Sequence, residues 1–428
     1  MFEIVNDTLY VKPTIDTTKV KCFPDELASY SHIVVCDGIT DVNFKGCRAV
    51  DSITLSPTVR AITNAACIVS PAKVIASSKI KNVVTLCDKA IPTWTEPVDI
   101  LREGDTLYIS SAECLIVPPI SDSDAKSILI QGSFKFIPPK AFVNCKAMES
   151  ICFEASIERI GRSAFQGLTN LTSVSLSSNL TNIGAYAFSG CTSLNNIVLP
   201  DKLSYIGLQA FYCCDALTEL VIPPSVQHVG TEAFANCIGL KSVKWEAKCY
   251  KVPNRCFCYC KALEDVQLSP NVVQLENAAF CYCYSLKDIP KTSRVGKYGR
   301  DVFGYCTSLT EVHIPHGVYH LVKDTFRGCH HITSIHFPAT ISYIPNKMFE
   351  GMLCLEKIYI PKHIRKCKAE CEVIRIDPLF NLVQNLPKHC VTDYIKEHNI
   401  LEHRLLFHLL SAIRAEVPEV EEVLKYVR

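Results

Sequence analysis

The clearest pattern along the chain is a set of apolar positions that return every 23 residues. A phenylalanine marks this interval ten times: Phe142, Phe165, Phe188, Phe211, Phe234, Phe257, Phe280, Phe303, Phe326 and Phe349. Apolar residues follow each phenylalanine at fixed offsets of six and nine residues, and usually also of eleven, as Leu171, Val174 and Leu176 follow Phe165. A period held over ten copies predicts a repeat array, in which each repeat is one structural unit.

The offsets within a unit predict one short strand per coil. Val174 and Leu176 are separated by one residue, so both face inward while Ser173 and Ser175 face outward. A single coil cannot bury its own apolar face, but stacked coils share a continuous core. We therefore expect a solenoid with a curved parallel sheet, and the ten phenylalanines of the return arms in one buried column.

The full unit reads Ile-Gly-x-x-Ala-Phe-x-x-Cys-x-x-Leu-x-x-Ile-x-Leu-Pro, and its segment from Leu171 to Asn179 fits the leucine-rich repeat template. From about Ile39 to Arg365 this pattern resembles the leucine-rich repeats of the BspA-like family, also called the Treponema pallidum type. The resemblance implies a leucine-rich repeat solenoid. It also implies an association with adhesion to host or matrix proteins, although members of the family bind different things.

The phase of the repeat divides the chain into four segments. They are an N-terminal cap at 1–38, divergent repeats at 39–127, regular repeats at 128–376 and a C-terminal helical cap at 377–428. Between Cys67 and Pro119 the phase slips, which indicates either coils of altered length or a separate small domain. Apolar residues from Leu401 to Ile413 recur every fourth residue, a helical stripe. These helices cover the open end of the last coil or, alternatively, bind a partner.

Two coils depart from the pattern in ways that predict local distortion. At Pro290 and Lys291 the strand carries a proline and a charge where other coils have apolar residues. Proline cannot donate to a strand ladder, so this coil should be bulged or frayed. Trp245 replaces a leucine in an inward row, which requires a wider coil or a partly exposed ring.

Charge and hydropathy exclude some classes of function. The net charge is +1 and no basic run is present, which argues against nucleic-acid binding. No apolar run reaches about 18 residues, so we expect no membrane span. The first 20 residues lack the basic head and apolar stretch of a signal peptide. We therefore expect a cytoplasmic protein, with a cell-surface location by a non-standard route as the alternative.

The 24 cysteines are best explained as core residues. At least eight stand three residues after the repeat phenylalanine, an inward position where a free thiol behaves as a small hydrophobe. We expect reduced thiols there, whereas an exported chain would favour disulfides.

One cluster has zinc-like composition: Cys256, Cys258, Cys260, Cys281 and Cys283. Some of these cysteines belong to the inward row and the others lie on the outside of the arm, so we expect that their sulfurs cannot bind one zinc ion together. We therefore predict no metal and no other cofactor. The sequence has no glycine-rich phosphate loop and no hydrolase motif. We therefore expect no enzyme, and a hydrolase or thiol enzyme is the alternative.

The candidate binding site is the outward face of the sheet, where each strand presents residues eight and ten positions after the phenylalanine. The residues predicted to bind a partner are Glu219, Asp265, Asp288, Glu311, His313, His336 and Tyr359. Asp265, Asp288 and Glu311 fall on consecutive coils, where like charges about 5 Å apart repel unless a partner supplies positive charge. The sequence thus predicts a non-catalytic scaffold that binds a protein or peptide with basic character, with an adhesin or an ordinary solvated face as alternatives. It does not define the oligomeric state.

Overall fold

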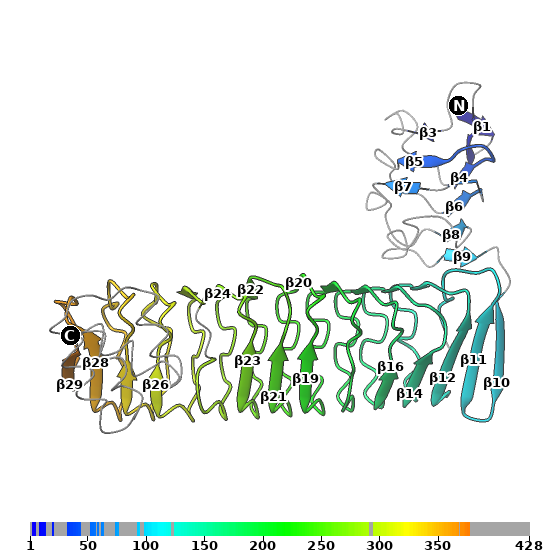
Figure 1. Ribbon diagram of the computed structural model, residues 1–428. Coiled ribbons are helices and arrows are strands. Elements are labelled where there is room, and N and C mark those ends of the chain that lie inside the picture. Colours follow the sequence, from blue (N-terminus) through cyan, green and yellow to red (C-terminus); the bar gives the residue numbers. More distant parts are fainter. Residues whose placement is uncertain are drawn as a thin grey trace, which may run out of the picture.

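The computed structural model describes the chain from Phe2 to Ile376 with gaps. Described are residues 2–5, 8–13, 19–20, 32–43, 52–56, 58–59, 61–63, 73–76, 92–94, 98–120, 124–290, 294–367 and 369–376. The strands form two stacks, a small one up to β9 and a long one from β10 onward (Figure 1). The described residues contain strands and turns but no helix. The predicted C-terminal helices at 377–428 lie outside them.

The first stack begins with two short strands at the N-terminus. β1 (Phe2–Val5) and β2 (Thr8–Val11) pair antiparallel as a hairpin. β2 then begins a parallel ladder of β4 (His32–Val35), β6 (Ser52–Leu55), β8 (Lys73–Ala76) and β9 (Pro92–Trp94). A second parallel sheet contains β3 (Lys19–Val20), β5 (Asp41–Asn43) and β7 (Ala61–Thr63). Parallel pairing thus starts within residues 1–38.

The long stack begins with a second antiparallel hairpin and continues as parallel coils. The hairpin consists of β10 (Asp99–Glu103) and β11 (Thr106–Ser111). The parallel strands that follow on the same face are β12 (Ser127–Gly132), β14 (Ser150–Phe153), β16 (Ser173–Ser175), β19 (Glu219–Ile222), β21 (Ser242–Trp245), β23 (Asp265–Leu268), β26 (Glu311–His313), β27 (Ser334–His336), β28 (Lys357–Pro361) and β29 (Glu372–Ile376). In register, Ile128 pairs with Ile151 and Ile151 with Val174, each 23 residues on. The predicted strands from β12 to β28 are confirmed, whereas β29 was not predicted and pairs with β28 at a spacing of only 15 residues.

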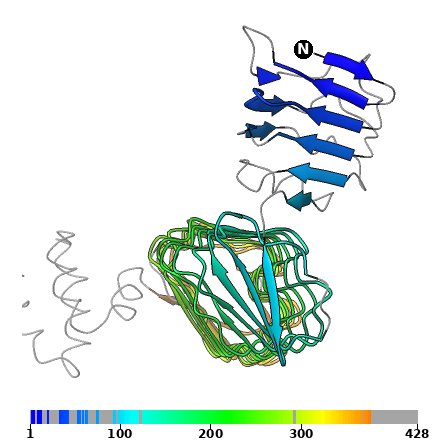
Figure 2. The ribbon, with the colours of Figure 1, turned by 90° about the vertical axis from the view of Figure 1, so that its right-hand side faces the viewer.

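Eight consecutive coils also contribute a second, shorter strand that the sequence did not predict. These two-residue strands are β13 (Phe136–Ile137), β15 (Arg159–Ile160), β17 (Asn182–Ile183), β18 (Tyr205–Ile206), β20 (His228–Val229), β22 (Lys251–Val252), β24 (Gln274–Leu275) and β25 (Lys297–Tyr298). Their second residues are buried and lie five positions before the repeat phenylalanine. Viewed along the solenoid axis, the coils superimpose around one interior (Figure 2).

The phenylalanine column is the centre of the core. Nine rings, from Phe142 to Phe326, are fully buried and stack in sequence with centroids 5.0 to 5.8 Å apart and planes within 13°. The tenth departs from the predicted column. Phe349 is only partly buried and packs edge-on against Phe337, with centroids 6.2 Å apart. The prediction of one buried column is therefore confirmed for nine of the ten rings.

The inward cysteines form a second column with a role beyond filling space. Seven of these thiols donate a hydrogen bond to the carbonyl oxygen of the phenylalanine one coil earlier, as Cys191 does to Phe165 (3.2 Å) and Cys237 to Phe211 (3.2 Å), whereas Cys145 donates to Ile120. The residues that repeat this bond are Cys191, Cys214, Cys237, Cys260, Cys283, Cys306 and Cys329. A buried carbonyl needs a partner, and cysteine supplies one from a small apolar side chain.

Burial also keeps these thiols protonated. It raises the pKa of Cys191 and of Cys237 to about 12, because a thiolate would lose its hydration in the core. All 19 cysteines in the described part of the chain are free thiols.

The turn into each return arm requires an unusual backbone. Two residues before the phenylalanine, φ is positive in eight consecutive coils from Lys140 to Asp301, between 49° and 58°. None of these residues is glycine, and the left-handed region costs an L-residue roughly 1–2 kcal/mol. The stacked core must therefore compensate for this strain in every coil.

The sheet is interrupted at two coils. Residues 287–290 form no strand, which separates β23 from β26, so the distortion predicted at Pro290 is confirmed. The other interruption follows β16, where only Asn196 makes an isolated bridge, to Ser173. Asparagine is depleted in strands, and Pro200 closely follows. Trp245 causes no break: its ring is 1% exposed and packs edge-on against Phe257, so a partly exposed ring is excluded.

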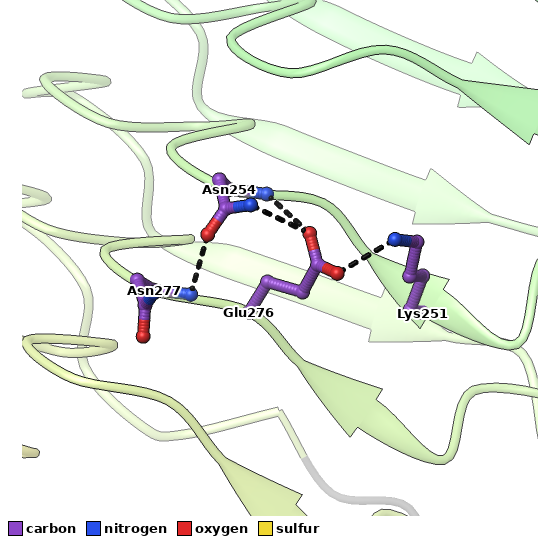
Figure 3. A network of polar contacts seen from close by, with 4 residues as sticks. All are labelled: Lys251, Asn254, Glu276 and Asn277. Atoms are coloured by element: carbon purple, nitrogen blue, oxygen red, sulfur yellow. Dashed lines mark hydrogen bonds and ion pairs between the residues drawn. The ribbon is translucent and has the colours of Figure 1, made fainter.

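A polar network ties three coils together beside the shorter strands (Figure 3). Glu276 Oε1 lies 2.6 Å from Lys251 Nζ, and its Oε2 accepts hydrogen bonds from the backbone and side-chain nitrogens of Asn254. Asn254 Oδ1 accepts from the Asn277 backbone, and Asn277 Oδ1 from the Arg300 backbone. These side chains satisfy backbone donors that no strand ladder reaches.

Candidate functional site

The structure brings four of the seven predicted site residues together on the outward face of β26, β27 and β28. Parallel register places His313 opposite His336, and His336 opposite Tyr359. The rings stack, with centroids 4.1 Å apart between the histidines and 4.0 Å apart between His336 and Tyr359. We call Glu311, His313, His336 and Tyr359 the histidine patch.

Glu311 is the charged centre of the histidine patch. Its Oε1 lies 3.0 Å from His313 Nε2 and 3.2 Å from His336 Nε2, so one carboxylate oxygen faces both imidazoles. The Glu311 side chain is 56% exposed, whereas that of His336 is 14% exposed between its two ring neighbours.

The environment of His336 favours its neutral form. Burial lowers the pKa of His336, and the neighbouring His313 lowers it further, while Glu311 acts in the opposite direction. Burial and His313 together outweigh the opposite effect of Glu311, so the pKa of His336 lies below its ordinary value.

The other three predicted residues lie apart from the histidine patch. Glu219 and Asp265 are exposed on β19 and β23, on either side of Ser242 in the register. Asp288 is in the coil that forms no strand, and its Oδ1 accepts a hydrogen bond from the backbone of Ile289. The predicted ladder of Asp265, Asp288 and Glu311 is thus interrupted at its middle member, because Pro290 prevents strand pairing there.

A second feature of the same face was missed from the sequence. Between β11 and the coil at Pro200, the outward residues enclose a hollow of about 700 Å³. Its lining includes Ser127, Ser150 and Ser173 in one row, and the hydroxyls of the first two lie 2.9 Å apart. The feature of the sequence that could have predicted this hollow is the run of small outward side chains, which leaves room above the sheet.

The zinc-like cysteines separate as expected. Cys256, Cys260 and Cys283 belong to the main core, whereas Cys258 and Cys281 pack with tyrosines in a second cluster on the outside of the arm. Hydrogen bonding with Cys281 lowers the pKa of Cys258, and the nearby Arg255 lowers it further. The two sets of sulfurs therefore face different environments.

A model of the BspA type leucine rich repeat region matches residues 135–264 and 250–371, which together span more than half of the chain. The chain belongs to the BspA-type leucine-rich repeat family. Its members are generally protein-interaction or surface proteins. In the described part of this BspA-type chain, no helix has the length and apolar character needed to cross a bilayer.

Several solved leucine-rich repeat structures are similar to this BspA-type chain. The T. pallidum leucine-rich repeat protein is 25% identical, with a TM-score of 0.38, covering 45% of this chain and 89% of its own. A leucine-rich repeat protein from Bacteroides ovatus is 21% identical, with a TM-score of 0.32, and the match covers 67% of this chain and 99% of that protein. A leucine-rich cell surface protein from Faecalibacterium prausnitzii is 23% identical, with a TM-score of 0.33, and the match covers 61% of this chain and 92% of that protein. No curated protein matches the chain.

Proposed function

We propose that this BspA-type protein is a non-catalytic scaffold whose histidine patch binds a basic segment of a partner protein. The observation that carries the proposal is the three-ring stack beside an exposed carboxylate on an open sheet face. The three stacked rings lie in a row along consecutive strands, and extended sheet faces are the surfaces that solenoids use for binding.

The chemistry of the histidine patch matches a lysine or arginine side chain. The aliphatic stem of such a residue packs on the ring of Tyr359, and its charged head reaches Glu311. A cation over an aromatic face contributes about 0.5–1 kcal/mol at an exposed site, and a charge-assisted hydrogen bond about 1.5–3 kcal/mol.

The proposal is tested with fluorescently labelled peptides and the purified full chain. We expect a peptide rich in lysine and arginine to bind more tightly than its alanine-substituted version, as measured by fluorescence anisotropy. Glu311→Gln should weaken binding about tenfold, since it removes the charged acceptor. Glu264→Gln is the matched control, because Glu264 is also exposed but lies on a distant coil. Equal binding by wild type and Glu311→Gln would overturn the proposal.

We also propose a reducing compartment, the cytoplasm, rather than the cell surface. Support comes from the seven core thiols that each donate to a phenylalanine carbonyl, an arrangement that a disulfide would disrupt. The same burial disfavours thiolates, which is why we propose no thiol catalysis by this row. Cell fractionation with thiol counting tests the location: oxidised thiols in a surface fraction would favour the adhesin alternative.

A further inference from the structure

We propose that Glu311, His313 and His336 form a binding site for a divalent transition-metal ion, of which Zn²⁺ is the best match. One carboxylate oxygen and two imidazole nitrogens from adjacent coils all lie within 4.8 Å of one another. This inference does not rest on the proposed function, but a bound ion and a basic segment would compete for the Glu311 carboxylate, because both proposals use it.

The measured separations suit a small coordination sphere. Ligand atoms about 2.1 Å from a tetrahedral zinc ion stand roughly 3.4 Å apart. Glu311 Oε1 is 3.0 Å from His313 Nε2 and 3.2 Å from His336 Nε2, close to that edge length. The two Nε2 atoms must turn toward each other, and the ring torsion of histidine is broad enough to allow this.

The donor set indicates which ions the site would accept. Two imidazoles with one carboxylate are ligands that zinc and other transition metals take, whereas magnesium and calcium prefer oxygen ligands alone. Three protein ligands leave a fourth position of zinc for water or for a group of a partner. The exposed Glu311 side chain, 56% accessible, places that position toward solvent.

The fold brings the two histidines side by side before an ion arrives, and only their rings have to rotate for both nitrogens to reach it. Parallel register fixes His313 beside His336, and His336 is clamped between the rings of His313 and Tyr359 at 4.1 and 4.0 Å. Both histidines project from strands of a stacked sheet rather than from loops, which limits the rearrangement that binding requires.

The test is calorimetric titration of the full chain with ZnCl₂ under conditions that keep thiols reduced. We expect one ion per chain. His336→Phe keeps a ring in the stack but removes a metal ligand. We expect it to weaken zinc binding by at least about tenfold, because losing only a residue that hydrogen-bonds to a ligand already has an effect of that size. Glu311→Gln should act in the same direction. The matched control is His228→Phe, since His228 also stacks on a ring, that of Tyr205, but lies on β20 away from this face.

Titration with Co²⁺ gives an independent readout of the ligand type. Nitrogen and oxygen ligands give only the weak visible bands of cobalt, whereas thiolate ligands add intense near-ultraviolet absorption. Visible bands that disappear in His336→Phe but persist in His228→Phe would support the site. Thiolate bands, binding that survives His336→Phe, or no binding by a folded wild type would each overturn it.

Discussion

Truncating one ring of the phenylalanine column should destabilise the solenoid more at its centre than at its end. Phe234 is fully buried between Phe211 and Phe257, with centroids 5.2 and 5.7 Å away. Removing a buried phenylalanine costs about 3–5 kcal/mol, and each lost aromatic pair adds roughly 0.5–1.5 kcal/mol beyond area burial. Two pairs are lost here, so we expect Phe234→Ala to cost about 5 kcal/mol.

Phe349→Ala is the matched control, because this ring is only partly buried and packs edge-on against Phe337. We expect its loss to cost about 2 kcal/mol, as for incomplete burial of an aromatic side chain. Urea unfolding followed by Trp245 fluorescence gives the free energy of unfolding, since that indole is buried against the column.

Amide hydrogen exchange shows which coils lose protection when the ring is removed. In a solenoid each coil is stabilised by its neighbours, so Phe234→Ala should expose amides mainly in the adjoining coils. Equal costs for Phe234→Ala and Phe349→Ala, or a loss of protection spread evenly over the chain, would refute the view that the column acts through nearest neighbours.

Three further substitutions test polar groups. Glu276→Ala removes a half-buried carboxylate that accepts a backbone hydrogen bond, so it should lower the free energy of unfolding in urea by about 2–3 kcal/mol. Its control is Glu264→Ala, which breaks an exposed ion pair and should lower that free energy by under about 1 kcal/mol. Tyr298→Phe removes a buried hydroxyl that has no partner in the described part of the chain and should raise the thermal midpoint; a lower midpoint would contradict this. Burial raises the pKa of Asp215, so its ionisation destabilises the fold above that pKa. Asp215→Asn should therefore stabilise the protein at pH 7, and this advantage should shrink as the pH falls toward 3.8, the ordinary value; a gain that is independent of pH would contradict the assignment.

The period of the phenylalanines was sufficient to predict the coil, the parallel sheet and the inward rows, because stacking identical units leaves few alternatives. The second strand row was missed since a two-residue strand such as Arg159–Ile160 is too short to show an alternating pattern. Its only signal was the recurring isoleucine and glycine, as in Ile160 and Gly161.

The sequence predicts those features of the histidine patch that depend only on the register of the strands. The fixed spacing alone predicts that His313 lies beside His336, and the structure agrees. Side-chain torsions were not predictable, so the convergence of both histidines on one oxygen of Glu311 could not be derived from spacing. The position of Asp288 was misjudged because a single proline removed its strand, an effect of backbone pairing rather than of charge.

The hydrogen bond from each core thiol to the preceding coil has a consequence for how such a chain changes length over evolution. Because the same bond and the same ring contact recur at seven consecutive junctions from Phe165 to Phe326, a duplicated or deleted unit of 23 residues within this part restores both at the new joint. An insertion of any other size within a coil must bulge out as a loop or shift all later donors away from their acceptors. Related genes should therefore differ by whole coils, while point changes accumulate on the outward face.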